Sequence, residues 1–378
     1  MKILMATWDC GGNIPPFLGL GAELVKKGHQ VACLTSGVLE PRFAKVGVEL
    51  IPAQKKATFD PLAKITNKAW EKEILDLWFG GDFPNELLKA CHKMNPDVLV
   101  IDYCLSSALA ATEAMPIPTV VLVHTLPGRI LSNWNKNLLG FANEARSRYN
   151  LETVNSAEQL WSNAGTTIVT SFETLDGMGV ASGVRELHYI GPISEPLDAD
   201  ATVREVQLRD ERPNVLVSFS TTFMEQEASL CEVMEAISQF DVNGLVTTGP
   251  SVEPDALPEI SNISKHKYLP HELIMPQMSV AIVHAGHGSV TKALKFGVPL
   301  LCMPLGRDQM YVSERISALG AGIYLDSAAP APEISKALRE LLNAPSYQTK
   351  AQELGDELKL LGAGEVNGSR YIELATEK

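Results

Sequence analysis

Short apolar runs alternate with amphipathic stretches along most of the 378-residue chain. In the first half, the runs with strand character lie at residues 2–7, 30–35, 48–53, 96–102, 119–124 and 166–171. The same rhythm resumes in the second half, with runs at residues 214–220, 245–249, 280–284, 299–303 and 322–325. Continuous apolar strands that alternate with helices are typical of parallel sheets covered on both faces. The pattern therefore predicts an α/β fold with two doubly wound parallel sheets.

A polar and charged segment at residues 194–212 separates the two series of strands. It holds no sustained apolar run, which is typical of a linker between domains. Two domains are also the natural expectation for this length, because single cores stop growing at about 250–300 residues. We expect an N-terminal domain over residues 1–205, a C-terminal domain over 206–355, and a helical tail over 356–378 that packs back on the first domain.

The composition is that of a soluble globular protein, with 45% hydrophobic and 20% charged residues. A net charge of −13 disfavours nucleic acid as a partner, because phosphate backbones bind to clustered Lys and Arg. The sequence shows no apolar leader, no run near the ~20 residues of a membrane span, no CxxC pair and no spacing of metal ligands. We therefore expect a cytoplasmic protein with reduced thiols, without integral membrane association and without a metal or other cofactor.

Polar side chains follow several strands of the first half at the point where each strand ends. Asp9 and Asn13 come just after the first strand, Asp102 ends the fourth, and His124 ends the fifth. In doubly wound sheets, ligands bind at the carboxyl ends of the strands. These four side chains are therefore candidates for one site.

A strand–turn–helix–strand unit at residues 280–303 carries two glycines, Gly286 and Gly288, at its turn. The helical pattern begins at Ser289. Such a turn lets backbone N–H groups and a helix N-terminus face an anion. The unit is thus a candidate site for a phosphate group.

Aromatic residues gather where the strand rhythm stops, at residues 54–81 and 127–162. They pack between helices in one interpretation, and in the other they form an apolar wall for a hydrophobic small molecule. The candidates for acceptor contacts in that wall are Trp70, Trp78, Phe79 and Trp134.

Several spaced motifs together resemble the nucleotide-sugar motif of the family 1 (UDP-glycosyltransferase-like) glycosyltransferases of the bacterial natural-product (macrolide/antibiotic) type. The HxGxxS core is HAGHGS at residues 284–289, and G-x-P is GVP at 297–299. The final P-x-x-x-D-Q is PLGRDQ at 304–309, and an aromatic two residues before a proline occurs in YLPH at 268–271. In the N-terminal half, the G-x-x-x-P of the family is GNIPP at 12–16.

The resemblance implies a GT-B fold, in which two doubly wound Rossmann-like domains face an interdomain cleft. It implies a hexosyltransferase that moves a hexose, with inversion, from a UDP-sugar or dTDP-sugar to a nucleophile, most often a hydroxyl, of a hydrophobic small-molecule acceptor. The nucleotide sugar would be a substrate, and no cofactor is implied. By the same resemblance, the donor contacts are Ser218, Thr221, Thr222, Tyr268, Leu269, His284, Gly286, His287, Gly288, Ser289, Asp308 and Gln309. In this set, the hydroxyls of residues 218–222 and the turn at 284–289 would contact the phosphates. Tyr268 would stack on the uracil or thymine ring, and Asp308 and Gln309 would bind the sugar hydroxyls.

The chain departs from the family at Asn13, where the family usually has a catalytic His or Asp. In the usual scheme that base is oriented by the Asp that matches Asp102, and it deprotonates the acceptor hydroxyl. An amide cannot take the proton. The base would then be Asp102, His124 or Asp9, unless the acceptor is acidic enough to need none or the protein is inactive.

Two other functions are compatible with the fold. A catalytically impaired homologue would bind a nucleotide sugar or assist a partner enzyme, and Asn13 is what supports it. A non-hydrolysing sugar-nucleotide epimerase is disfavoured by the near-complete motif at 304–309 and the loop at 12–16.

A second departure generates a prediction about the nucleotide. The family usually has a carboxylate that accepts the ribose hydroxyls three residues after the serine of the motif, and here that residue is Lys292, which only donates. If ribose recognition is weak here, the protein will bind dTDP about as well as UDP, and Lys292→Ala will weaken both to a comparable degree. Thermal shift with each nucleotide measures this, and a strong preference of the unmutated protein for UDP would contradict it.

Overall fold

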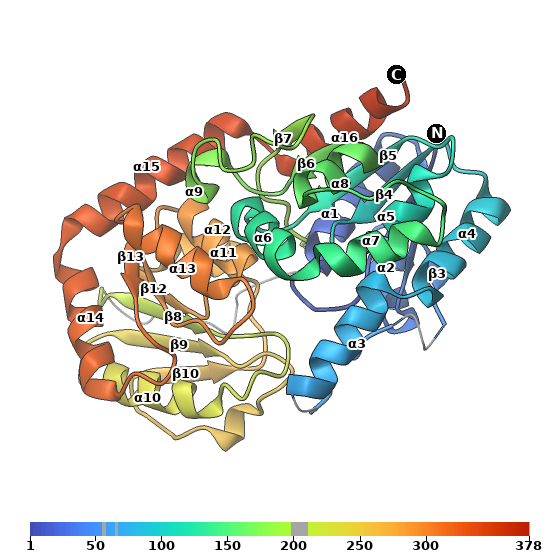
Figure 1. Cartoon of the computed structure of the whole chain (residues 1–378). Coiled ribbons are helices and arrows are strands. Elements are labelled where there is room, and N and C mark those ends of the chain that lie inside the picture. Colours follow the sequence, from blue (N-terminus) through green and yellow to red (C-terminus); the bar gives the residue numbers. More distant parts are fainter. Residues whose placement is uncertain (55–57, 65–66, 198–210, 378) are drawn as a thin grey trace. The chain divides into compact units, whose positions relative to one another are not determined.

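The computed structural model describes residues 1–54, 58–64, 67–197 and 211–377 (Figure 1). By its contacts the chain divides into a first unit, Met1–Pro196 with Gly362–Lys378, and a second unit, Leu197–Leu361. Each unit is built on a parallel sheet, so the expected fold class of two parallel-sheet α/β domains is confirmed. The boundary expected at residues 205–206 lies outside the described residues.

Within the described part of the first unit, seven strands pair in parallel in the order β3-β2-β1-β4-β5-β6-β7. The short edge strand β7 was missed by the sequence pattern, because its residues are only half-buried and form no apolar run. The strands are β1 (Lys2–Ala6), β2 (Gln30–Thr35), β3 (Glu49–Pro52), β4 (Val98–Asp102), β5 (Thr119–Val123), β6 (Thr166–Val169) and β7 (Leu187–Tyr189).

Helices cover both faces of this sheet, because successive strand residues point to opposite sides. In β1, Ile3 and Met5 join one apolar cluster, whereas Leu4 and Ala6 join the other. The helical segments are α1 (Ile14–Lys26), η1 (Gly37–Leu39), α2 (Glu40–Lys45), α3 (Asn67–Phe79), α4 (Asp82–Met94), α5 (Ser106–Glu113), α6 (Pro127–Asn133), the π-helical turn η3 (Trp134–Leu138), α7 (Leu139–Ser147), α8 (Ala157–Ala164) and α9 (Glu173–Asp176).

In the second unit, six strands of the described residues pair in parallel in the order β10-β9-β8-β11-β12-β13. The edge strand β10 has polar residues and was not predicted. The strands are β8 (Asn214–Ser218), β9 (Asn243–Thr247), β10 (Ile263–His266), β11 (Val280–Val283), β12 (Leu300–Cys302) and β13 (Gly322–Tyr324). The helical segments are α10 (Glu227–Ser238), η4 (Pro254–Ala256), α11 (His271–Ile274), η5 (Met275–Gln277), α12 (His287–Lys295), α13 (Gln309–Ala318), α14 (Ala331–Asn343) and α15 (Pro345–Leu361).

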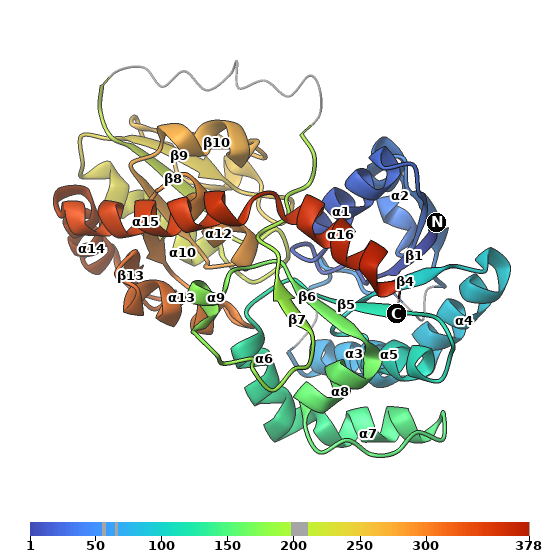
Figure 2. The ribbon, with the colours of Figure 1, turned by 90° about the horizontal axis from the view of Figure 1, so that it is seen from above.

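The last helix, α16 (Gly364–Ala375), returns to the first unit and packs against α1 (Figure 2). Its Ile372 is fully buried, and its Glu373 accepts from His29 Nε2 at 2.9 Å and from Lys27 Nζ at 2.8 Å. The returning segment begins at Gly362 rather than at residue 356, because α15 continues to Leu361. Among the helices of the described ranges, none is both long and apolar enough to cross a bilayer.

The seating of α16 generates a prediction about Gly364. A Cβ at this position would clash with the carbonyl oxygens of Gly191 and Pro192, which are backbone atoms and cannot rotate away. We expect Gly364→Ala to lower the free energy of unfolding by about 1–3 kcal/mol, the usual cost of overpacking. Chemical denaturation measures it.

The matched control is Gly140→Ala on α7, where nothing lies within 4 Å of the added Cβ. An exposed helical Gly→Ala change leaves stability unchanged or raises it by up to about 1 kcal/mol. Equal stability of the two variants would show that α16 is not seated as described.

Candidate functional site

The polar residues that follow β1, β4 and β5 meet at one edge of the first sheet. These strands are neighbours in the order β1-β4-β5 and run in parallel, so their carboxyl ends lie together. The structure brings Asn13, Asp102 and His124 into contact there. It adds Thr7, which the sequence interpretation missed although it is a polar residue at a strand end.

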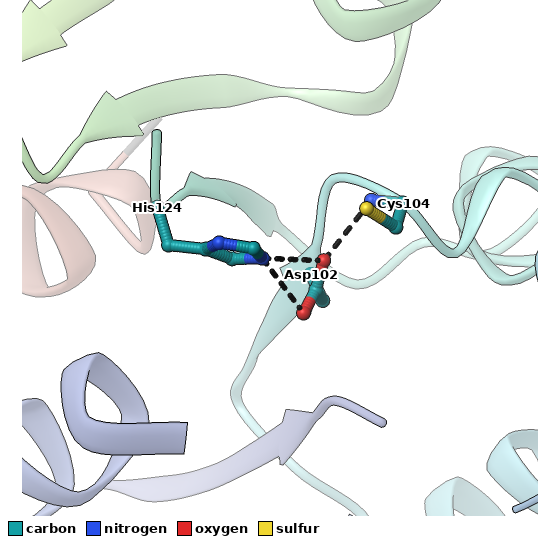
Figure 3. Close-up of side chains that lie close together, drawn as sticks. All are labelled: Asp102, Cys104 and His124. Carbon is teal, nitrogen blue, oxygen red and sulfur yellow. Dashed lines mark hydrogen bonds and ion pairs between the residues drawn. The ribbon is translucent and has the colours of Figure 1, made fainter. Parts of the chain in front are cut away.

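Asp102 is the centre of this group and has no exposed surface. Its Oδ2 accepts from Thr7 Oγ1 at 2.8 Å and from Asn13 Nδ2 at 3.1 Å, and its Oδ1 accepts from the backbone N–H of Cys104 at 3.0 Å. His124 Nε2 lies 3.3 Å from both oxygens (Figure 3). Burial by itself would raise the pKa of Asp102, but His124 and these hydrogen bonds outweigh it, and the pKa lies below its ordinary value. The carboxylate is therefore ionised at neutral pH.

His124 reaches Asp102 from the end of β5, and Figure 3 shows the two side chains pointing toward each other. Its side chain is 13% exposed, in contrast to the fully buried carboxylate. The ring lies against Tyr103, with ring centroids 4.9 Å apart. His124 is thus held in place and still touches solvent.

The side chain of Asn13 braces the loop between β1 and α1. Its Nδ2 lies 3.0 Å from Thr7 Oγ1, 2.5 Å from the Trp8 carbonyl oxygen and 3.1 Å from Asp102, and its Oδ1 accepts from the N–H of Cys10 at 3.0 Å. Asn13 is 2% exposed. Its polar atoms are therefore committed to the loop and to the carboxylate.

Asp9 lies outside this group. Its Oδ1 accepts from the N–H of Gly11 at 3.3 Å, and no hydrogen bond within the described residues joins it to Asp102 or His124. Burial raises the pKa of Asp9, with the Gly11 N–H and Arg42 acting in the opposite direction. Asp9 is the least favoured of the predicted candidates for the base.

The predicted acceptor-binding aromatics form one cluster next to this site. Trp78 stacks on Trp134 at 6.2 Å, Phe79 lies 5.5 Å from Trp134, and Trp134 lies 6.3 Å from Tyr103. Phe79 and Trp134 are buried in the apolar core, whereas Trp70 and Trp78 are only partly buried. The packing interpretation therefore fits Phe79 and Trp134, and acceptor contact by Trp70 and Trp78 stays a prediction.

Asp102, Cys104 and His124 offer three ligand atoms within 4.8 Å of one another, a spacing that a metal ion could use. Burial and the Asp102 charge raise the pKa of the Cys104 thiol well above its ordinary value, and thiols bind metals as thiolates. The Asp102 oxygens are already hydrogen-bonded. We therefore assign no metal to this group.

In the second unit, the turn between β11 and α12 carries the HAGHGS motif. Ala285 adopts a left-handed conformation with φ 60°, and Gly286 is the N-cap of α12. The first helical bonds run from the N–H groups of Ser289 and Val290 to the Gly286 oxygen. The N–H groups of His287 and Gly288 come before these bonds and lie at the positive end of the helix. These features make the turn a candidate anion site.

The imidazole of His284 lies over Gly286 and belongs to the same turn. A Cβ on Gly286 would lie 2.5 Å from His284 Nε2. Burial lowers the pKa of His284 to about 4, against the opposing effects of the Ser218 backbone and Asp308. His284 is therefore neutral at pH 7 and offers a hydrogen bond instead of a charge.

The loop at 304–309 is shaped by Gln309, which was predicted as a sugar contact. Its Oε1 accepts from the N–H of Leu305 at 2.8 Å and of Gly306 at 3.2 Å, and its Nε2 lies 3.5 Å from Met224 Sδ. Gln309 is 3% exposed, whereas Asp308 is half-buried at the N-cap of α13. Sugar contacts by both residues stay predictions.

The loop after β8 holds the predicted hydroxyl contacts. Ser218 and Thr222 are buried, whereas Thr221 is exposed. Ser220 Oγ lies 2.9 Å from Thr222 Oγ1, and Gln226 Nε2 donates to the Ser220 oxygen at 3.0 Å. Ser220 lies within the stretch 218–222 that the sequence interpretation singled out, whereas Gln226 was missed, since nothing in the local pattern shows that its amide turns inward.

The YLPH segment is predicted to contact the nucleobase of the donor. Its Tyr268 is 77% exposed, and its Leu269 is buried. Next to it, His271 Nε2 lies 3.2 Å from Thr247 Oγ1. Burial, followed by the charge of Lys292, lowers the pKa of His271 to about 3. Lys292 is half-buried and close to His271, so it belongs to the surroundings of this segment instead of lying free in solvent.

Comparison with known proteins relates the chain to glycosyltransferases. Residues 231–360 match the family model described as "Erythromycin biosynthesis protein CIII-like, C-terminal domain". The 4'-demethylrebeccamycin synthase of Lentzea aerocolonigenes is 24% identical over 94% of this chain and 95% of its own length. The NDP-glycosyltransferase YjiC of Bacillus subtilis (strain 168) is 23% identical over 89% of this chain and 86% of its own length.

Among solved structures, the calicheamicin glycosyltransferase CalG4 superposes with a TM-score of 0.81 at 18% identity. The match covers 100% of this chain and 98% of that one. The resemblance to GT-B natural-product glycosyltransferases is therefore confirmed, together with the enzyme class that it implied.

The contact between Gly286 and His284 generates a prediction. Gly286→Ala displaces the His284 ring and the turn, so we expect the affinity for UDP or dTDP to fall about 10- to 100-fold, the loss of a hydrogen bond to a charged group. Isothermal titration measures it. The matched control is Gly140→Ala on α7 of the first unit, because nothing lies within 4 Å of a Cβ there. Equal affinities of the two variants would contradict a donor role for the turn.

Proposed function

We propose that this GT-B glycosyltransferase of the natural-product type moves a hexose, with inversion, from a UDP-sugar or dTDP-sugar to a hydroxyl of a hydrophobic small molecule. The observation that carries the proposal is the turn at residues 284–289, where a neutral histidine and a helix N-terminus lie next to the loop that holds Asp308. The turn suits the diphosphate of a nucleotide sugar, and the loop with Asp308 suits its sugar.

The second unit would hold the donor. The N-terminus of α12 would take the diphosphate, because its N–H groups and dipole favour negative charge. The same interactions would stabilise the nucleoside diphosphate as it leaves, so the proposal needs no metal ion. Asp308 would accept hydrogen bonds from the sugar hydroxyls, and Tyr268 would stack on the base.

The first unit would receive the acceptor. Trp70 and Trp78 keep exposed apolar surface in the cluster that adjoins Tyr103 and His124. A hydrophobic acceptor fits such a wall, with its hydroxyl toward the polar edge of the sheet. The names of the relatives include products such as rebeccamycin and calicheamicin, and this chemistry agrees with a natural-product acceptor.

A catalytically impaired homologue is the second candidate, because Asn13 stands where the family usually has its base. Its amide braces a loop and takes no proton. The two candidates differ in whether any product forms, since both would bind the nucleotide sugar.

We expect a glycosylated product when the protein is incubated with UDP-glucose or dTDP-glucose and a set of hydrophobic acceptors, such as 4-methylumbelliferone, a flavonol and a sterol. Mass spectrometry detects the added hexose, and the coupling constant of the anomeric proton gives its configuration. Asp308→Asn should reduce transfer about 10-fold or more through the lost sugar contacts, whereas Asp255→Asn, on the exposed surface, should not. Nucleotide binding without any product would support the impaired homologue, and a retained configuration would exclude inversion.

A further inference from the structure

We infer that His124 is the general base of the transfer, with its Nδ1 taking the proton of the acceptor hydroxyl and Asp102 positioning the ring. The inference rests on the proposed function, because it requires an acceptor hydroxyl. The resemblance places the base in the loop after β1, at the position of Asn13, whereas His124 lies at the end of β5.

Asp102 cannot itself reach an acceptor. It is fully buried, and two carboxylate oxygens offer about four lone-pair positions. The donors that fill them are the Thr7 hydroxyl, the Asn13 amide, the Cys104 N–H and His124 Nε2. With these donors around it and no exposed surface, the carboxylate has no open side for a substrate. Asp102 is therefore a positioning residue.

The same carboxylate fixes the tautomer of His124. An ionised carboxylate only accepts hydrogen bonds, so the Nε2 that faces it must carry the proton. In the neutral ring, Nδ1 then holds the free lone pair. Nδ1 has no hydrogen-bond partner among the residues that the structure describes, and the side chain is 13% exposed.

The other polar members of the group are poor bases. Asn13 is an amide, Thr7 is fully buried, and the Cys104 thiol is 2% exposed with a raised pKa. Among the described residues, His124 is therefore the one group of this cluster that combines a free lone pair with contact with solvent.

Nδ1 of His124 takes the proton of the acceptor O–H, and the oxygen forms a bond to the anomeric carbon of the sugar. The bond from that carbon to the diphosphate oxygen breaks, and its electron pair leaves with the nucleoside diphosphate. The resulting imidazolium is stabilised by Asp102 until its proton returns to water.

The test is His124→Gln, measured with phenols of increasing acidity up to 4-nitrophenol and with whichever of UDP-glucose and dTDP-glucose the unmutated protein uses. A general base contributes about 10²- to 10⁴-fold. We expect kcat to fall by this factor for phenol and by much less for 4-nitrophenol, which ionises without help. The KM for the donor should not change. The matched control is His92→Gln, an exposed histidine on α4.

The pH dependence provides a second readout. The base must be neutral, so kcat/KM of the unmutated protein should rise with pH to a plateau between about pH 5 and 8. This rise of kcat/KM with pH, the acidic limb of the profile, should be absent in His124→Gln. Tyr103 and Cys104 also face the ring, but the thiol stays protonated because burial raises its pKa, and Cys104→Ser should keep the limb. Asp102→Asn should lose it, because an amide facing Nε2 favours the opposite tautomer.

Near-normal turnover of His124→Gln, or an equal loss for every phenol, would overturn the inference, since the second result indicates a structural role. If circular dichroism shows that His124→Gln is unfolded, the test is made on the unmutated protein. A transfer rate of that protein that does not change between about pH 5 and 8 would then overturn the inference. Rescue of His124→Ala by added imidazole would support it. If the unmutated protein transfers to no acceptor, the proposed function fails instead.

Discussion

The ionised carboxylate of Asp102 is the constraint on which the polar edge of the first unit depends. A charge without contact with solvent costs several kcal/mol unless donors replace the lost water. Here the donors come from the ends of β1, β4 and β5 and from the loop before α1. The sheet order and the strand register must hold for all of them to meet one carboxylate. The same interactions that make the charge tolerable also fix the orientation of His124.

Two loops of the second unit that carry the sequence motif hold strained backbone. Ala285 and Arg307 have left-handed backbone conformations, with φ 60° and 62°, and each costs about 1–3 kcal/mol. One lies in the turn before α12 and the other in the loop before α13. Burial is the main cause of the lowered pKa of His284, and smaller, opposing effects of Asp308 and Arg307 place the second loop near this imidazole. Strained residues of this kind cluster at ligand sites, so their position agrees with the proposed donor site.

The sequence predicted the fold class and the central strands because these are continuous apolar runs. It missed β7 and β10, whose short, partly polar segments owe their strand form to a neighbour at the sheet edge. The motif residues were found by their spacing along the chain.

The roles of several site residues depend on tertiary contacts that no spacing contains. Gln309 accepts hydrogen bonds from its own loop. Thr7 and the Cys104 N–H donate to Asp102. Phe79 and Trp134 are buried in the core. Spacing along the chain therefore selects candidate residues, but it does not give the direction in which each side chain points.

The return of α16 to the first unit has a consequence for how the protein is made. The strands of that unit leave the ribosome early, but α16 follows the whole of the second unit in the sequence. Until it arrives, Leu20, Ile168 and Ile190 lack the helix that packs against them through Gly368. During synthesis, the apolar surface of the first unit that α16 covers therefore stays exposed until the second unit and α16 have been made.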